Sequence, residues 1–162
     1  MRRILWFRRD LRTTDNPLLS HDAEVLPIFI FDSNILKKLN PDDKRVAFLF
    51  QQVIHLKKAL RAMKLDLLIF YGDPLEVFKS IQPDLFYEVV ASGDYDESSR
   101  KRDLKIAQIL HFKYLEDTYL FSPNAILKKD QTPYLVFTPF YKQAIKLLEK
   151  TQTLPYKHGT LT

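Results

Sequence analysis

The stretch Ile4-Leu5-Trp6-Phe7-Arg8-Arg9-Asp10-Leu11-Arg12 decides the fold of this chain. Its first four residues are large and apolar, a run that is too short for a helix and typical of a strand buried on both faces of a parallel sheet. The charged half follows at the carboxyl end of that strand, which is the edge where open α/β sheets bind ligands. Such a loop is either a solvated surface segment or a fixed network of ion pairs that docks a ligand or partner, and its position directly after a buried strand favours the network.

Apolar runs and helical patterns alternate along the rest of the chain. Asn16-Pro17 predicts a helix start directly after the charged loop, because Asn caps helices and Pro suits their first turn. Asn40-Pro41 and Asp73-Pro74 predict two more helix starts in the same way. Strands are expected at residues 4–7, 25–31, 67–71, 85–90 and 112–116, and further helices over 46–63, 100–111 and 140–148. Pro27 is unusual inside a central strand, so an irregular start is expected there.

This alternation predicts an α/β fold: an open five-stranded parallel sheet with helices on both faces, Rossmann-like, with right-handed crossovers. The strand order is expected to reverse between the first and fourth strands, which creates a crevice lined by the loops after Phe7, Phe31 and Val90. The α/β domain is expected to cover residues 1–150, followed by a tail or the start of an interdomain linker over 151–162.

Composition excludes several classes of function. The chain contains no Cys, which excludes disulfides and thiolate metal sites and suits a cytoplasmic location. Its three glycines cannot form a dinucleotide fingerprint or a P-loop. A net charge of +5 permits contact with nucleic acid without demanding it. Neither a signal peptide nor a membrane span is expected. No metal site is expected from the scattered His21, His55, His111 and His158.

The opening motif, followed by Asp15-Asn16, resembles the hallmark of the N-terminal domain of the DNA photolyase and cryptochrome family. Further matches occur in the family's order at residues 45–49, 72–74, 100–103 and 134–140. The resemblance covers nearly the whole chain. It implies a Rossmann-like domain that holds a light-harvesting pigment.

The resemblance also implies a partner, a helical FAD-binding domain of the same protein that carries the DNA lesion groove and the tryptophans that pass electrons to the flavin. This fragment alone is therefore expected to be inactive, and DNA is reached only through the full-length protein, a light-dependent deoxyribodipyrimidine photo-lyase (a flavoprotein and carbon–carbon lyase). No membrane partner is expected. Trp6 is the only tryptophan of the chain, and a core position is expected for it rather than a redox role.

Two pigment patterns can be compared with this sequence. In members that resemble the folate-binding type, an Asn-Glu pair stands where this chain has Ser98 and Ser99. In members that resemble the deazaflavin-binding type, an Asp-x-Glu pair and a helix-opening arginine stand at Asp94, Asp96 and Arg45. The aspartate at position 96 is one methylene shorter than the family's glutamate. An 8-hydroxy-5-deazaflavin or FMN antenna is therefore favoured over methenyltetrahydrofolate.

A flavin-like ring offers N–H donors to carboxylates and carbonyl acceptors to an arginine, while apolar neighbours hold it flat and dry. The candidate cofactor-binding residues are Phe7, Arg8, Asp32, Arg45, Asp94 and Asp96. A second explanation stays open, in which Asp94 caps the next helix and Arg45 pairs at the surface. No catalytic or metal-binding residue is assigned.

Two other functions stay open. The chain could be a cryptochrome-like or stand-alone binding or signalling module that uses the same pocket without repair. An adenine-nucleotide-binding domain of similar topology is disfavoured by the lack of a glycine-rich loop. In the family the charged loop helps to join the two domains, so Arg9→Ala and Asp10→Ala are expected to weaken that junction.

Overall fold

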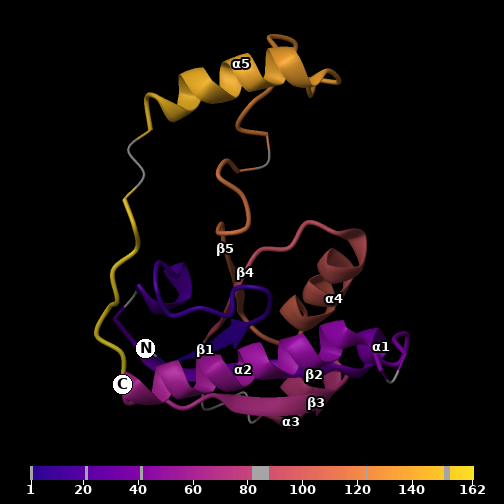
Figure 1. Cartoon of the computed structure of the whole chain (residues 1–162), viewed down its shortest axis with the longest axis vertical. Helices are drawn as coiled ribbons and strands as arrows, with labels where there is room; N and C mark the ends of the chain where they lie inside the picture. The colour runs from indigo at the N-terminus through magenta and orange to yellow at the C-terminus, as the bar shows by residue number, and fades with distance from the viewer. Residues whose placement is uncertain (1, 21, 41, 82–87, 123, 152–153) are drawn as a thin grey trace. The chain divides into compact units, whose positions relative to one another are not determined.

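The computed structural model describes residues 2–20, 22–40, 42–81, 88–122, 124–151 and 154–162. The chain divides into two units. One unit holds the residues up to Thr118 together with Tyr156–Thr162, and the other holds Tyr119–Pro155 (Figure 1). The domain bounds expected from the sequence, 1–150 and 151–162, stay predictions.

The first unit is built on a five-stranded sheet with the strand order β3-β2-β1-β4-β5. All four strand pairings are parallel. The chain therefore starts in the middle of the sheet, builds outward to one edge, and then crosses over to build the other side. The predicted reversal of strand order between the first and fourth strands is confirmed. The strands are β1 (Arg2–Phe7), β2 (Glu24–Asp32), β3 (Leu68–Gly72), β4 (Glu88–Ser92) and β5 (Phe112–Leu115).

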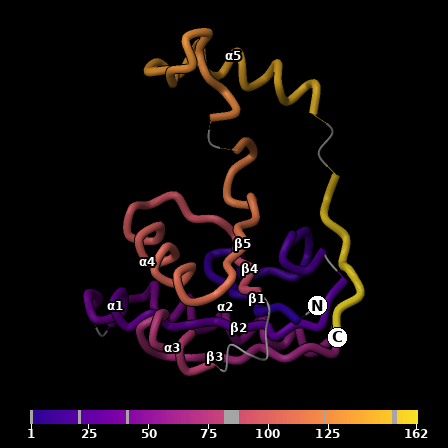
Figure 2. Tube along the Cα trace, turned by 180° about the vertical axis from the view of Figure 1, so that it is seen from behind, coloured from indigo at the N-terminus to yellow at the C-terminus, as the bar shows by residue number. Residues whose placement is uncertain are grey.

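Helices cover both faces of this sheet, as predicted. Leu5 and Phe7 belong to the same apolar core as Leu60 of α2, whereas Ile4 and Trp6 belong to the core shared with α3 and α4. Successive side chains of a strand point to opposite faces, so one short apolar run supplies both cores. In Figure 1, α2 lies in front of the strands. α3 and α4 cover the opposite face of the sheet, which is turned toward the viewer in Figure 2. The helices of this unit are η1 (Pro17–Leu19, a 3-10 helix), α1 (Ser33–Leu36), α2 (Lys44–Ala62), α3 (Pro74–Ser80) and α4 (Glu97–Ala107).

Each strand differs from its expected range by one or two residues at a described end, and the differences at β4 and β2 are informative. Of the expected strand 85–90, residues 85–87 lie outside the described residues, and β4 continues past Val90 to Ser92. β2 runs unbroken through Pro27, so the expected irregular start is wrong. At Pro27, β2 pairs with β1 on one side only, because β3 pairs with β2 only from Ile28 onward. Proline is tolerated where one side of a strand is unpaired.

Two of the three predicted helix starts are confirmed. The Asn16 side chain accepts a 2.9 Å hydrogen bond from the N–H of Leu18 at the start of η1. The Asp73 side chain accepts a 2.9 Å hydrogen bond from the N–H of Leu75 at the start of α3. In both cases the proline follows the cap directly.

The third predicted helix start, at Asn40-Pro41, is wrong as far as the described residues show. The helix α2 begins at Lys44, and its N-cap is Asp43, which accepts a 2.9 Å hydrogen bond from the N–H of Arg45. Pro41 lies outside the described residues. The sequence analysis also missed α1, which starts directly after β2 with Asp32 as its N-cap.

The second unit contains α5 (Phe137–Leu148), which begins three residues before the expected helix 140–148. The last residues of the chain belong to the first unit. There, Val25 N–H donates to the carbonyl of Thr162 at 2.7 Å, and Ala23 forms a parallel bridge with Leu161. Among the described residues, no helix has both the length and the apolar composition that a membrane crossing requires.

Candidate functional site

The charged loop after β1 is held by a buried network of polar contacts. The Arg8 guanidinium donates to the Asp103 carboxylate of α4 at 2.7 Å and to the carbonyl of Ser92. Asp10 accepts from the N–H of Arg8 at 2.9 Å and from the Ser92 hydroxyl at 2.7 Å. These contacts join the carboxyl ends of β1 and β4 to α4, so this part of the loop is a fixed network rather than a solvated segment.

The outer arginines of the loop extend this network toward solvent. Arg9 lies 3.1 Å from Asp94 and 3.3 Å from Asp96. Arg12 donates to Asp117 at 2.6 Å, and this hydrogen bond is the largest cause of the raised pKa of Arg12. The loop thereby presents cations whose directions are set by carboxylates on neighbouring segments.

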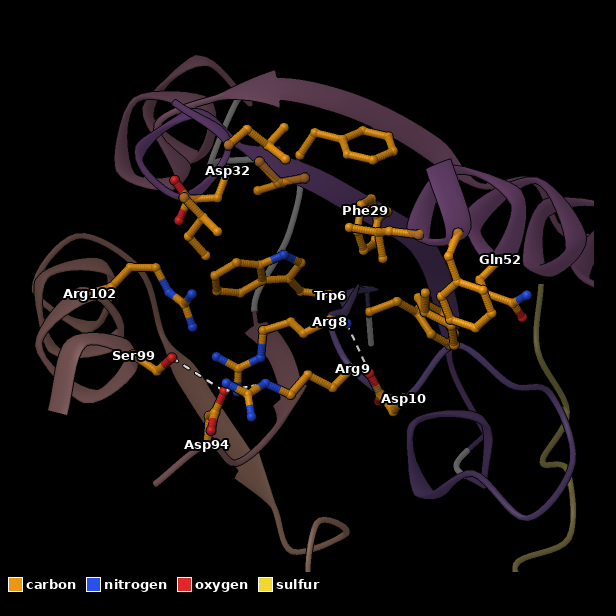
Figure 3. Close-up of a pocket in the computed structure, with 18 of the residues that line it drawn as sticks. Trp6, Arg8, Arg9, Asp10, Phe29, Asp32, Gln52, Asp94, Ser99 and Arg102 are labelled. Atoms are coloured by element: carbon orange, nitrogen blue, oxygen red, sulfur yellow. Dashed lines mark hydrogen bonds and ion pairs between the residues drawn. The ribbon is translucent and has the colours of Figure 1, made fainter. Parts of the chain in front are cut away.

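A cavity of about 540 Å³ opens at the carboxyl ends of β1 and β2, between the first turns of α2 and the start of α4 (Figure 3). The loops after β1 and β4, on either side of the switch point of the sheet, both contribute to its lining, and a ligand site is expected there in an open α/β fold. Its volume is within the range of small-molecule sites. Aromatic and aliphatic side chains dominate one wall, and the charged loop forms the other. The apolar lining consists of Trp6, Phe7, Leu11, Phe29, Ile30, Phe31, Ile35, Leu36, Phe48 and Leu49.

Trp6 lies at the floor of the cavity and is 2% exposed, which confirms the expected core position. The guanidinium carbons of Arg8 and Arg102 lie 5.0 Å and 4.9 Å from the centroid of its ring. Figure 3 shows Arg102 and Arg8 beside the indole. Its Nε1–H is buried and has no hydrogen-bond partner among the described residues. The indole therefore carries an unused donor within the cavity lining.

Four of the six candidate cofactor-binding residues line the cavity: Phe7, Arg8, Asp32 and Asp94. The side chain of Asp94 is only 12% exposed. It accepts a 3.2 Å hydrogen bond from the Ser99 hydroxyl. Asp94 does not cap the helix that follows β4, because the N-cap of α4 is Asp96.

Asp96 and Arg45 do not line this cavity. Asp96 accepts from the Ser98 hydroxyl at 2.6 Å and from the N–H of Ser99 at 2.9 Å, and these hydrogen bonds hold its pKa below the usual range. Arg45 donates to Asp43 at 2.6 Å in an exposed pair at the start of α2. Arg45 is thus already paired with a carboxylate two residues away. A role for Arg45 or Asp96 in binding a cofactor stays a prediction.

Sequence reasoning missed several lining residues. Phe48 and Gln52 of α2 line the cavity, as does Arg102 of α4. Phe48 is 63% exposed, which is unusual for an aromatic side chain in the first turns of an otherwise amphipathic helix. Phe48 and Gln52 are four residues apart and therefore lie on the same face of the helix. This spacing is the feature of the sequence that could have identified them as neighbours in a site. Among the described residues, no group of His, Asp or Glu is arranged to hold a metal ion, and His21 lies outside them.

Comparison with known proteins gives a consistent result. A family model described as DNA photolyase matches residues 3–157. The chain is 32% identical to the deoxyribodipyrimidine photo-lyase of Alkalihalophilus pseudofirmus over 92% of its length, and 31% identical to that of Halobacterium salinarum over 86%. It is 26% identical to cryptochrome-2 of Arabidopsis thaliana over 94% of its length. The chain spans about a third of the two photo-lyases, 34% and 33% of their lengths.

Solved structures of similar fold are also photolyases. The archaeal photolyase of Sulfolobus tokodaii, described with two FAD molecules and a novel light-harvesting cofactor, matches the whole chain with a TM-score of 0.77 and 26% identity, over 38% of its own length. A class III photolyase of Agrobacterium tumefaciens matches 99% of the chain with a TM-score of 0.76, and the match covers 35% of the photolyase. At 23% identity the second likeness shows the fold alone.

Proposed function

Since this chain belongs to the DNA photolyase and cryptochrome family and forms its N-terminal domain, we propose that it binds the light-harvesting pigment of a deoxyribodipyrimidine photo-lyase. One observation carries this proposal: the apolar cavity of about 540 Å³ at the switch point of the sheet, bounded by the family's opening motif. Such a cavity takes a flat, mostly apolar group with a few polar edges.

The lining of the cavity fits a flavin-type ring. Two buried N–H groups of lining residues have no partner among the described residues: Trp6 Nε1 and Arg8 Nε. Arg102 Nη2, by contrast, lies 2.9 Å from the Asp103 carboxylate. Buried donors without partners are costly, and ring carbonyls would satisfy them. The Asp94 carboxylate supplies an acceptor for a ring N–H. The cavity therefore suits a ligand edge that carries carbonyl acceptors and one N–H donor. The pyrimidine edge of a flavin has this arrangement.

The choice of pigment rests on the polar residues at the start of α4. Ser98 and Ser99 stand where the folate-binding pattern has an Asn-Glu pair, and serine offers neither the charge nor the bidentate amide. Asp94 keeps the acceptor of the deazaflavin pattern and lines the cavity. We therefore favour 8-hydroxy-5-deazaflavin or FMN over methenyltetrahydrofolate.

In this proposal the bound pigment absorbs light and passes the energy to FAD in a helical domain of the same protein. The residues of this chain bind and orient the ring and exclude water from it. Phe29 and Phe31, whose ring centroids lie 5.0 Å apart, supply part of the flat wall. DNA repair, contact with DNA, the helical partner domain and a cytoplasmic location all belong to the proposal for the longer protein. This chain alone is proposed to be inactive.

A second candidate is a cryptochrome-like module that uses the same cavity without repair. The similarity to cryptochrome-2 of Arabidopsis thaliana over 94% of the chain supports this second candidate. Both candidates need a pigment cavity, and they differ only in the activity of the longer protein.

The test uses the full-length protein purified from its native host. Mass spectrometry of the released chromophores identifies the pigment, and repair of pyrimidine dimers is measured in light and in darkness. A deazaflavin or FMN beside FAD, with light-dependent repair, supports the proposal. Folate overturns the choice of pigment. Bound pigment without repair favours the cryptochrome-like candidate, and loss of all antenna pigment in an otherwise active protein rejects the pigment role.

A further inference from the structure

We propose that the pigment carries a phosphate, which binds in a cationic side cavity next to the ring site; this inference rests on the proposed function. The side cavity measures about 340 Å³ and lies between α1, α3 and α4. It adjoins the main cavity, because both are lined by Asp32, Ile35, Ser99 and Arg102. A ligand could therefore place its ring in one cavity and its tail in the other.

Cationic side chains dominate the side cavity. Lys38 of the segment after α1 and Lys101 and Lys105 of α4 line it together with Arg102. Lys101 also pairs with Glu97 at 2.6 Å, but both side chains are at least 70% exposed. Exposed pairs of this kind are weak, and an ammonium keeps further N–H donors for another acceptor. The three lysines thus remain available to an anion, whereas Arg102 is paired with the Asp103 carboxylate at 2.9 Å.

The two carboxylates of the side cavity are already engaged. Asp32 accepts from the N–H of Asn34 at 2.8 Å. Asp73 accepts from the Asn34 amide at 2.6 Å and from the N–H of Leu75 at 2.9 Å. Both carboxylates therefore serve as helix caps, and the cationic groups outnumber them.

The two cavities differ in a way that suits one ligand with two ends. The main cavity has aromatic walls, and the arginines in its lining are already paired with carboxylates of the chain: Arg8 and Arg102 with Asp103, Arg9 with Asp94, and Arg12 with Asp117. The side cavity offers several charged donors, which bind phosphate oxygens strongly. Riboflavin phosphate, FMN, has this construction. A carboxylate tail, as in folates, carries the same sign of charge, so the test includes it as a separate arm.

The experiment compares FMN with riboflavin, which differ only by the phosphate. Dissociation constants are measured by isothermal titration calorimetry on the full chain, with methenyltetrahydrofolate as the third ligand. FMN should bind roughly tenfold more tightly than riboflavin or better, the effect of one charge-assisted hydrogen bond. High salt should weaken FMN binding more than riboflavin binding.

A triple variant, Lys38→Gln with Lys101→Gln and Lys105→Gln, should remove the preference for FMN and leave riboflavin affinity unchanged. The matched control is Lys58→Gln with Lys64→Gln and Lys79→Gln, three exposed lysines that line neither cavity. This control changes the net charge equally and should keep the preference.

Each outcome is decisive. Equal affinities for FMN and riboflavin, or a preference that survives the first triple variant, overturn the side-cavity proposal and leave the proposed function intact. A lysine-dependent preference for the folate instead of FMN overturns the assignment to phosphate. If none of the three ligands binds, the side-cavity proposal is overturned, and the proposed function is rejected as well if 8-hydroxy-5-deazaflavin also fails to bind.

Discussion

Arg8 and Asp103 stand 95 positions apart in the sequence and meet at 2.7 Å in the interior of the first unit. Their side chains are 8% and 0% exposed. Arg8 directly follows β1, and Asp103 lies in α4, whose start borders the main cavity. This pair therefore fixes the position of α4 relative to the carboxyl end of β1, and with it one wall of the cavity.

Removing one partner of this pair should destabilise the chain strongly. Asp103→Ala leaves the buried Arg8 charge without its carboxylate, so we expect a loss of about 3–5 kcal/mol in the free energy of unfolding. The double variant Arg8→Met with Asp103→Leu should recover only part of that loss, because the unpaired Arg8 charge is gone while Arg102, which pairs with Asp103 at 2.9 Å, still loses its carboxylate. Urea unfolding followed by circular dichroism measures both. Glu97→Ala, in an exposed pair, is the control and should change stability by less than about 1 kcal/mol.

The carboxylate of Asp94 should matter for binding more than for folding. Asp94→Asn is expected to weaken flavin binding about tenfold, because an ionised acceptor makes the stronger hydrogen bond to a ring N–H. Glu24→Gln, which removes an exposed carboxylate that pairs with Arg2 and lines neither cavity, should leave the affinity unchanged. Calorimetric titration with FMN checks this. Equal affinity of the Asp94 variant and the parent would remove Asp94 from the site.

Acid should weaken the start of α2. Hydrogen bonds from Arg45 lower the pKa of Asp43 from 3.8 to about 2. A lowered native pKa gives stability that is present above the unfolded value and is lost as the pH falls through the native value. The free energy of unfolding should therefore decline between about pH 4 and pH 2. Asp43→Asn keeps a capping side chain but should show a smaller decline in urea unfolding over that range. An identical decline in parent and variant would show that this carboxylate contributes nothing.

The returning end of the chain should protect backbone amides of β2. The N–H of Ala23 donates to Thr160 at 3.1 Å, and the N–H of Val25 donates to Thr162 at 2.7 Å. Deleting residues 156–162 should speed hydrogen exchange at these two amides, because local protection depends on these bonds. The amide of Phe29, inside the paired part of β2, is the internal reference. Unchanged exchange at Val25 would mean that the end of the chain does not hold this position.

The sequence predicted the sheet and the place of the cavity because both depend on local patterns. The apolar run at residues 4–7 could only be a buried strand, and strand–helix alternation then determined the parallel order. The charged nature of the loop was also readable. Its main partner, Asp103, was not identified, because a long-range ion pair depends on how α4 is rotated against the sheet.

Side chains at helix starts were the least predictable part of the site. Arg45 was assigned to the pigment from a family pattern, yet in the structure it pairs with Asp43 two residues earlier. An arginine at a helix start can pair with the capping carboxylate or with a ligand. The spacing of residues in the sequence does not reveal which of the two contacts is the stronger. Leu49 packs against the core below α2 and also lines the cavity, because the first turns of α2 border the cavity mouth.

The central claim, that the cavity above Trp6 holds a flat pigment, can be measured with the protein's own reporter. Trp6 is the only tryptophan in the chain and lies in the cavity lining. Titration with FMN or 8-hydroxy-5-deazaflavin should quench its fluorescence to saturation at one ligand per chain. Fluorescence that shows no saturable change with either ligand, while the chain remains folded by circular dichroism, would contradict the claim.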